Sequence, residues 1–118
     1  METKAAVSAL AALAHESRLS VFRLLVECGP DGCSAGQLAE TLNILPSSLS
    51  FHLKELSHAG LVSSTPQGRF VIYSANFSAM GELLKFLTEN CCHGEPCMPI
   101  TDEMSELTAK SNTAKRAK

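Results

Sequence analysis

The chain has 118 residues, a formal net charge of −2 and 45% hydrophobic residues, which predicts one globular domain. Nothing in it resembles a signal peptide or a membrane span, because Ser, His, Glu and Lys interrupt the longest apolar runs. We therefore expect a cytoplasmic protein whose five cysteines are thiols, ligands or redox groups rather than a disulfide framework. The net negative charge argues mildly against a nucleic-acid partner, but the charge is uneven, and Lys54 and Arg69 both lie in the part of the chain predicted below to bind DNA.

Two helices are predicted before residue 30. The first spans Thr3 to Ala14 and is rich in Ala, with Val7, Leu10, Leu13 and Ala14 on one side, and its small side chains allow close approach to another helix. The second spans about Glu16 to Cys28 and ends at Gly29-Pro30, and its expected inward residues are Leu19, Phe22, Leu25 and Val26. Arg18 stands in its first turn, where the helix dipole favours anions, so a DNA phosphate and a solvated surface position are both open for it.

A helix-turn-helix is predicted from Ser34 to Gly60. Ser34 and Gln37 have the spacing of a capping box, Asn43 interrupts the helical pattern, and Pro46 can occupy the first turn of a second helix. The second helix has a leucine stripe made of Leu49, Leu53 and Leu56. Its opposite face carries Ser47, Ser50, Phe51, Lys54 and His58. Hydroxyls, one cation and one apolar ring suit phosphates and base edges in the major groove, whereas an ordinary helical hairpin with a solvated face is the alternative.

A β-hairpin and a last helix follow. After Gly60 the sequence pattern changes from the helical period of 3.6 to the strand period of 2, in Leu61–Thr65 and Phe70–Ser74. These two runs flank the turn signature Pro66-Gln67-Gly68-Arg69. A hairpin with a basic tip beside a groove-reading helix is a wing. The last helix is expected to begin after Asn76 and to extend to about Asn90.

The fold class is therefore mostly α with a β-hairpin wing (α+β), a winged helix-turn-helix. Residues 1–92 form the predicted DNA-binding and dimerisation domain, and residues 93–118 form a tail that is disordered towards its end. Because one short recognition helix contacts few base pairs, we expect a homodimer that binds double-stranded operator DNA. The predicted interface joins the N- and C-terminal helices, with Val7, Leu10 and Leu13 against Leu83, Leu84 and Leu87 of the other subunit.

This order of elements resembles the ArsR/SmtB family of metal- and metalloid-responsive repressors, over roughly residues 5 to 90. The matching runs are residues 13–19 (LAHESRL), 37–39 (QLA), 49–56 (LSFHLKEL), 59–62 (AGLV) and Gly68-Arg69 with Tyr73. The resemblance implies a dimer that binds its operator without inducer and releases it on binding an ion. It implies DNA contacts from Ser47, Ser48, Ser50, Phe51, Lys54 and Arg69.

The sequence departs from the family at both of its well-known ligand sites. Many arsenic-responsive members carry the run C-V-C-D-L-C in the first helix of the helix-turn-helix, where this chain has Ser34 to Ala39 without a thiol. The zinc-responsive members use Asp, His and Glu on the last helix, and the run from Phe77 to Asn90 contains no His. Neither site is present here.

Three thiols after the last helix, Cys91, Cys92 and Cys97, form the predicted inducer site. Soft thiolates select soft ions, and trivalent arsenic or antimony favours a pyramid of three sulfurs. Some arsenic-responsive members of the family likewise place a Cys-Cys pair and a third Cys after the last helix. Zn²⁺ or Cd²⁺ is an alternative if His93 supplies a fourth ligand, and three unpaired thiols on a loose tail are another.

The other two cysteines are interpreted as background. Cys28 is expected to be a small buried hydrophobe, and Cys33 has no partner near it in the sequence. A thiol-based sensor of oxidants or sulfur species, in which Cys97 pairs with Cys91 or Cys92, is the second function hypothesis. An enzyme is not expected, because no cysteine is accompanied by a base with an orienting acid and there is no Gly-rich phosphate loop.

Overall fold

The computed structural model of the chain describes residues 1–94. The chain divides into two compact units, Met1–Leu84 and Lys85–Lys118. The boundary expected after residue 92 stays a prediction. The elements in chain order are α1 (Thr3–Leu13), α2 (Glu16–Cys28), β1 (Cys33–Ser34), α3 (Ala35–Leu42), α4 (Pro46–His58), β2 (Val62–Gln67), β3 (Phe70–Ala75), α5 (Phe77–Thr88) and the short 3₁₀ helix η1 (Cys91–Gly94).

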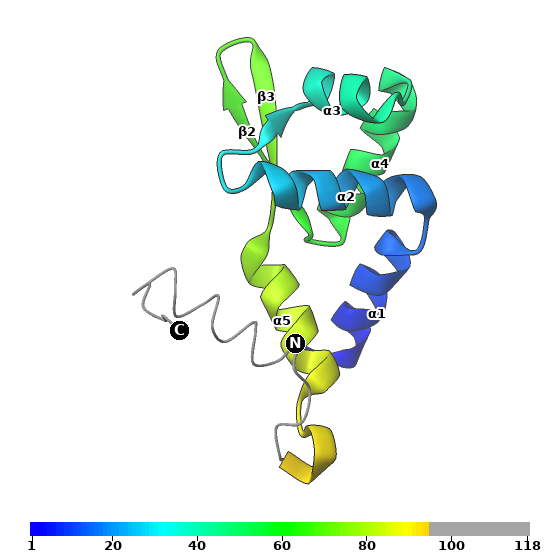
Figure 1. Cartoon of the computed structure of the whole chain (residues 1–118), viewed down its shortest axis with the longest axis vertical. Helices are drawn as coiled ribbons and strands as arrows, with labels where there is room; N and C mark the ends of the chain where they lie inside the picture. Colours follow the sequence, from blue (N-terminus) through cyan, green and yellow to red (C-terminus); the bar gives the residue numbers. More distant parts are fainter. Residues whose placement is uncertain (95–118) are drawn as a thin grey trace. The chain divides into compact units, whose positions relative to one another are not determined.

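Helix α2 is the centre of the first unit and contacts α1, α3, α4 and β3 (Figure 1). The largest fully buried side chains come from α2, α3, α4 and the residue before β2: Val21, Leu25, Leu38, Leu49, Leu53, Leu56 and Leu61. Leu61 precedes β2, so the core continues from the helix-turn-helix into the base of the hairpin. This is the winged helix-turn-helix architecture that the sequence predicts.

Both N-terminal helices bury one face, and in α2 the expected residues Phe22 and Leu25 are buried. In α1 the buried residues are Ala6, Ala9 and Ala12, whereas Val7 and Leu10 are 59% and 42% exposed. The small side chains allow α1 to approach its neighbours closely and leave its larger apolar residues outside. In α2, Leu19 is exposed and Val21 is buried instead. Leu19 lies about 110° around the helix from the centre of the buried face, so the predicted inward position of Leu19 is wrong.

The local signals that start and stop the helix-turn-helix are confirmed. The Ser34 side chain accepts a hydrogen bond from the Gln37 backbone N–H at 3.2 Å, and Gln37 Oε1 accepts from the Ser34 N–H at 2.8 Å. Asn43 ends α3 in the left-handed conformation with φ of 55°, and Pro46 stands in the first turn of α4. These contacts determine where each of the two helices begins and ends.

The hairpin belongs to a three-stranded antiparallel sheet of order β1-β3-β2. Its strands extend further than predicted, because Pro66 pairs with Val71 and Gln67 with Phe70, which leaves only Gly68 and Arg69 in the turn. Pro66 is tolerated since β2 is an edge strand. The two-residue strand β1, which the sequence analysis missed, pairs Cys33 with Tyr73 and Ser34 with Ile72.

Helix α5 begins as expected and ends earlier. Asn76 Oδ1 accepts a hydrogen bond from the Ala79 N–H at 3.1 Å, so Asn76 caps the helix. The helix ends at Thr88 rather than Asn90, and Asn90 has a positive φ of 61°. Leu83 is buried within the chain, so the prediction that it faces a second subunit is wrong. No helix in residues 1–94 has the length and apolar character needed to cross a membrane.

Candidate nucleic-acid interface

Helix α4 separates an apolar face from a polar one. Leu49, Leu53 and Leu56 are at most 2% exposed and attach the helix to the core. The residues predicted to contact DNA from this helix all lie on the exposed side: Ser47, Ser48, Ser50, Phe51 and Lys54. Phe51 is 53% exposed although it is a large aromatic side chain, and such a residue on a solvent-facing helix surface is a candidate for contact with a partner. The face has the composition predicted for a recognition helix.

An Arg–His–Phe cluster connects this face to the N-terminal end of α2. The Arg18 guanidinium carbon lies 5.4 Å from the centre of the Phe51 ring, which is within the range of a cation–π interaction. Arg18 Nε also donates a hydrogen bond to His52 Nδ1 at 3.4 Å. The His52 ring lies 4.8 Å from that of His15, and His15 caps α2 by accepting a hydrogen bond from the Ser17 N–H. Arg18 is therefore not a freely solvated side chain.

His52 is neutral in this arrangement. Only the unprotonated Nδ1 can accept the hydrogen bond from Arg18. Burial, followed by the nearby His15 and Arg18, lowers the pKa of His52 below its ordinary value of 6.5. His52 is therefore a packing and hydrogen-bonding residue, 8% exposed and bonded to Arg18. As long as it stays neutral, His52 holds Arg18 over Phe51 at the edge of the recognition face.

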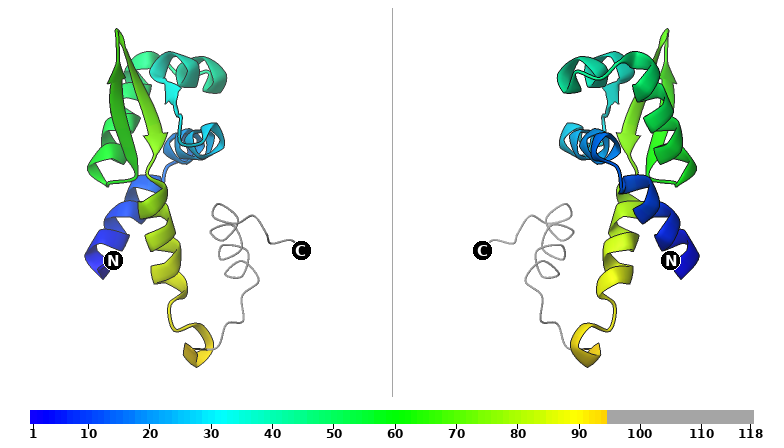
Figure 2. Two further views of the ribbon diagram at one scale, coloured as in Figure 1. Left: turned by 90° about the vertical axis from the view of Figure 1, so that its left-hand side faces the viewer. Right: turned by 90° about the vertical axis from the view of Figure 1, so that its right-hand side faces the viewer.

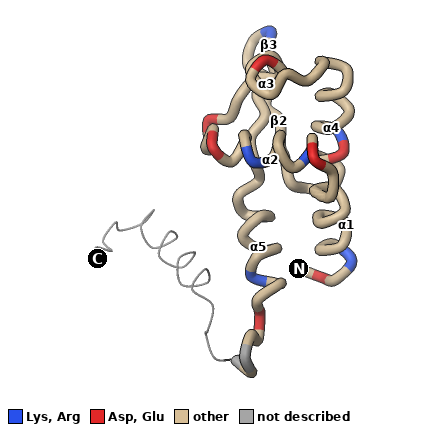
Figure 3. Tube along the Cα trace, turned by 45° about the vertical axis from the view of Figure 1, so that its right-hand side comes forward, with Lys and Arg blue, Asp and Glu red and all other residues tan. Residues whose placement is uncertain are grey.

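The hairpin β2–β3 carries the other predicted basic contact. Both views in Figure 2 show the hairpin projecting at the end of the first unit where α3 lies. Arg69 stands in the two-residue turn, and Figure 3 shows a basic position at this tip. Gly68 precedes it with φ of 62°, a conformation that side chains rarely adopt. The tip therefore presents Arg69 to solvent at the place where a wing would contact DNA.

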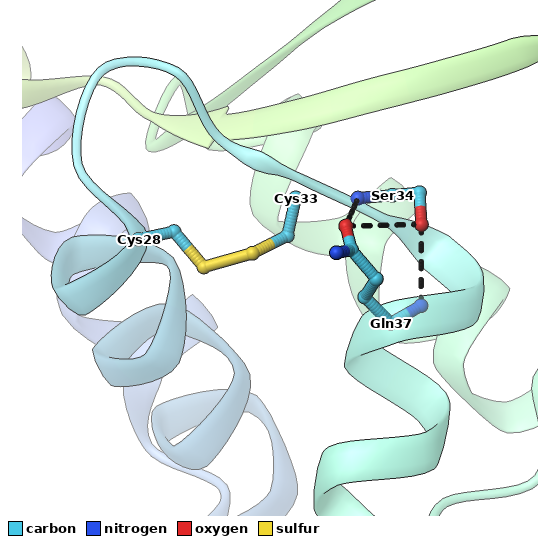
Figure 4. Close-up of a disulfide and its surroundings, with 4 residues drawn as sticks. All are labelled: Cys28, Cys33, Ser34 and Gln37. Atoms are coloured by element: carbon cyan, nitrogen blue, oxygen red, sulfur yellow. Dashed lines mark hydrogen bonds between the residues drawn. A yellow bond between two sulfur atoms is a disulfide. The ribbon is translucent and has the colours of Figure 1, made fainter.

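Cys28 and Cys33 form a disulfide, which corrects their interpretation as background residues (Figure 4). They are five positions apart, with Cα atoms 6.3 Å from one another, and both side chains are half-buried. The turn between them contains Gly29 and Gly32, whose φ angles are 80° and 74°. This turn reverses the chain and returns Cys33 to the end of α2. The five-residue separation of the two cysteines does not by itself indicate that they pair. The two glycines between them were the sequence feature that could have indicated the chain reversal.

Comparisons with known proteins agree with this geometry. A family model described as a helix-turn-helix domain matches residues 13–65. The transcriptional activator HlyU of Vibrio cholerae is 30% identical over 87 residues, which are 74% of this chain and 78% of HlyU. The chain belongs to the ArsR/SmtB-like winged-helix family of transcriptional regulators. It is a DNA-binding regulator and not an enzyme.

Further relatives support the same family and fold. The regulator YceK of Bacillus subtilis is 38% identical over 58 residues, 49% of this chain and 57% of YceK. A solved structure of Vibrio cholerae HlyU is 35% identical, with a TM-score of 0.58 over 74% of this chain and 97% of that one. An ArsR-like regulator from Rhodococcus sp. RHA1 has a TM-score of 0.65 at 24% identity, covering 98% and 96% of the two chains. The homodimeric winged helix-turn-helix domain Mb0332 of Mycobacterium bovis has a TM-score of 0.59 at 17% identity, covering 80% and 88%.

The thiols that follow α5 lie only partly within the described residues. Cys91 is half-buried and begins η1, and His93 in the same 3₁₀ turn has a positive φ of 60°. Cys97 lies outside the described residues, so the predicted three-sulfur site of this ArsR/SmtB-like regulator stays a prediction. The DNA contacts assigned to individual side chains also stay predictions.

Proposed function

We propose that this chain is a cytoplasmic homodimeric repressor that binds operator DNA without ligand and releases it when trivalent arsenic or antimony binds Cys91, Cys92 and Cys97. Helix α4 enters the major groove and the Arg69 tip contacts the adjacent backbone. The observation that carries the DNA-binding part is the exposed face of α4, with Phe51 and Lys54 outward while three leucines anchor the helix in the core. HlyU is named an activator, so repression is part of the proposal rather than of the family.

Exposed apolar side chains support dimerisation. Val7 and Leu10 on α1 and Leu87 on α5 are 59%, 42% and 54% exposed. Val7 and Leu10 are three positions apart and therefore neighbours on one face of α1, and contiguous exposed apolar surface marks a site of contact with another protein. The homodimeric Mb0332 domain shares the fold. A two-fold dimer would present two α4 helices to successive half-sites, which one chain cannot do.

The chemistry of the three thiols supports a metalloid as the ligand. The run from Cys91 to Cys97 supplies three sulfurs within seven residues, and it contains Gly94 and Pro96, which favour a bend between the vicinal pair and the third thiol. Three sulfurs without a fourth ligand suit trivalent arsenic or antimony. Zn²⁺ or Cd²⁺ would need His93 as the fourth ligand. To switch DNA binding, the ion must bind the DNA-free dimer more tightly than the DNA-bound one.

The proposal is tested with a duplex selected from a random-sequence pool by the full-length protein. Binding is measured by fluorescence anisotropy in a phosphine reductant, because a dithiol reductant would itself bind arsenite. Arsenite or antimonite at one equivalent per chain should weaken wild-type binding by about fivefold or more, the lower end of common allosteric coupling. Zn²⁺ and Cd²⁺ are titrated in parallel, and release by these ions alone would contradict the metalloid assignment.

Matched variants locate the ion. Cys91→Ser, Cys92→Ser and Cys97→Ser should each bind the duplex without ion and fail to release it when arsenite is added. Cys28→Ser and Cys33→Ser should keep the response to arsenite. If Cys97→Ser is still released fully, two thiols suffice and a methylated arsenical is the better ligand. Loss of the response in Cys33→Ser would place the ion elsewhere and overturn the assignment.

A further inference from the structure

The Cys28–Cys33 pair is placed so that the bond can form and break without a change of fold. The Cα–Cα distance of 6.3 Å lies within the range of about 4.4–6.8 Å that disulfides span without backbone movement. Both side chains are half-buried, so a small oxidant or a reductant can reach them. The glycine turn brings the two residues near each other, and within it the Gly32 N–H donates a hydrogen bond to the Gly29 carbonyl at 3.0 Å.

The pair also lies directly before α3, the first helix of the helix-turn-helix. Cys33 pairs with Tyr73 on the wing strand β3, and the next residue, Ser34, caps α3 through Gln37 (Figure 4). Gly32 is packed so closely that a Cβ atom there would stand 2.3 Å from the Tyr73 carbonyl oxygen. The disulfide therefore joins the end of the central helix α2 to the short strand β1, which pairs with the wing strand β3 and leads directly into α3.

A regulator that binds chromosomal DNA works where glutathione and thioredoxin keep most thiols reduced, and intracellular disulfides there are usually transient and redox-active. We propose that Cys28 and Cys33 are a reversible oxidation site that tunes operator affinity, separate from the thiols after α5. A hydroperoxide is the oxidant. The thiolate of one cysteine attacks the O–O bond and becomes a sulfenic acid with release of water, and the second thiol attacks that sulfur and releases a second water. The sum is two thiols and one hydrogen peroxide giving one disulfide and two waters.

Oxidation strengthens DNA binding. The disulfide is present here together with an intact capping box, a paired β1 and an exposed α4 face, so the oxidised form is compatible with the binding geometry. Reduction removes the covalent link between the end of α2 and β1, so the two segments can move more relative to each other. DNA binding must then restrict this motion, which costs free energy that the oxidised protein does not spend on binding. We expect the oxidised protein to bind about fivefold more tightly than the reduced protein, at the lower end of common coupling between sites.

Peptide mapping on the full-length wild-type protein tests the chemistry. Trypsin cleaves after Arg23 and Lys54, so Cys28 and Cys33 share the peptide 24–54, whereas Cys91, Cys92 and Cys97 share the peptide 86–110. After treatment with hydrogen peroxide and then catalase, peptide 24–54 should take up no alkylating reagent. After phosphine reduction it should take up two equivalents. Two alkylatable thiols in that peptide after peroxide would overturn the proposal.

Anisotropy with the selected duplex tests the consequence. The wild-type protein is compared in its peroxide-treated and phosphine-treated forms, without any metalloid. Cys28→Ser and Cys33→Ser should bind with the affinity of the reduced wild-type protein after either treatment. Equal affinity of the two wild-type forms would refute the coupling. A difference that persists in Cys28→Ser would assign the effect to the thiols after α5 and would equally refute it.

Discussion

Reducing the Cys28–Cys33 disulfide should lower the stability of the folded protein by an amount set by the small size of its loop. The sequence separation is 5, so the bond closes a loop of six residues. The chain-entropy relation for such a loop gives about 2 kcal/mol at 25 °C, because the bond restricts the unfolded chain more than the folded one. The glycine turn adds to this, since Gly29 and Gly32 make the unfolded loop especially free.

The assay is urea unfolding followed by far-UV circular dichroism, with oxidised and phosphine-reduced wild-type protein at one fixed protomer concentration. The midpoint should be lower for the reduced protein, and Cys28→Ser should match the reduced protein under both conditions. Cys28→Ser keeps the thiols after α5, so it controls for their oxidation. Coincident curves for oxidised and reduced wild type would refute the reasoning that this bond constrains the unfolded chain.

Three further outcomes test individual parts of the structure. Gly32→Ala should destabilise the fold by about 1–3 kcal/mol more than Gly29→Ala in urea unfolding, because both have positive φ but only Gly32 also faces a backbone oxygen. Because burial lowers the pKa of His52 in the folded protein, the stability that neutral His52 contributes is complete above pH 6.5 and is lost as the pH falls towards the folded pKa. The free energy of unfolding, measured from pH 7.5 to 5, should therefore depend less on pH in His52→Asn than in the wild-type protein. Leu10→Glu should shift sedimentation from dimer to monomer, whereas an unchanged dimer would move the interface away from α1.

The helix-turn-helix could be predicted from sequence because its signals are local. A capping box, a left-handed Asn43 and a Pro46 at a helix start each act over a few residues. The leucines of α4 repeat at helical spacing, so the sequence indicates which face of the helix is buried. The exposed residues of that helix followed directly, so their exposure is confirmed, while the role of this face in recognition and its individual DNA contacts stay predictions.

The parts that sequence reasoning missed depend on tertiary context. The sequence of α1 does not indicate that its alanines form the buried face, because that depends on how closely the neighbouring elements approach the helix. Strand β1 has only two residues and exists because the wing strand β3 pairs with it. The Cys28–Cys33 bond depends on the conformation of two glycines, and a five-residue separation by itself does not distinguish paired from unpaired thiols.

The central claim is that α4 and the wing read DNA, and the salt dependence of binding tests it most directly. Lys54→Ala and Arg69→Ala are compared with wild type and with the control Lys85→Ala, which removes a cation from α5, by anisotropy on the selected duplex across a range of salt concentrations. Each of the first two should weaken binding and reduce the slope of log affinity against log salt by about one unit, the value for one lost phosphate contact. Lys85→Ala should match wild type. Unchanged affinity and slope in both Lys54→Ala and Arg69→Ala would contradict the assignment of this face to DNA.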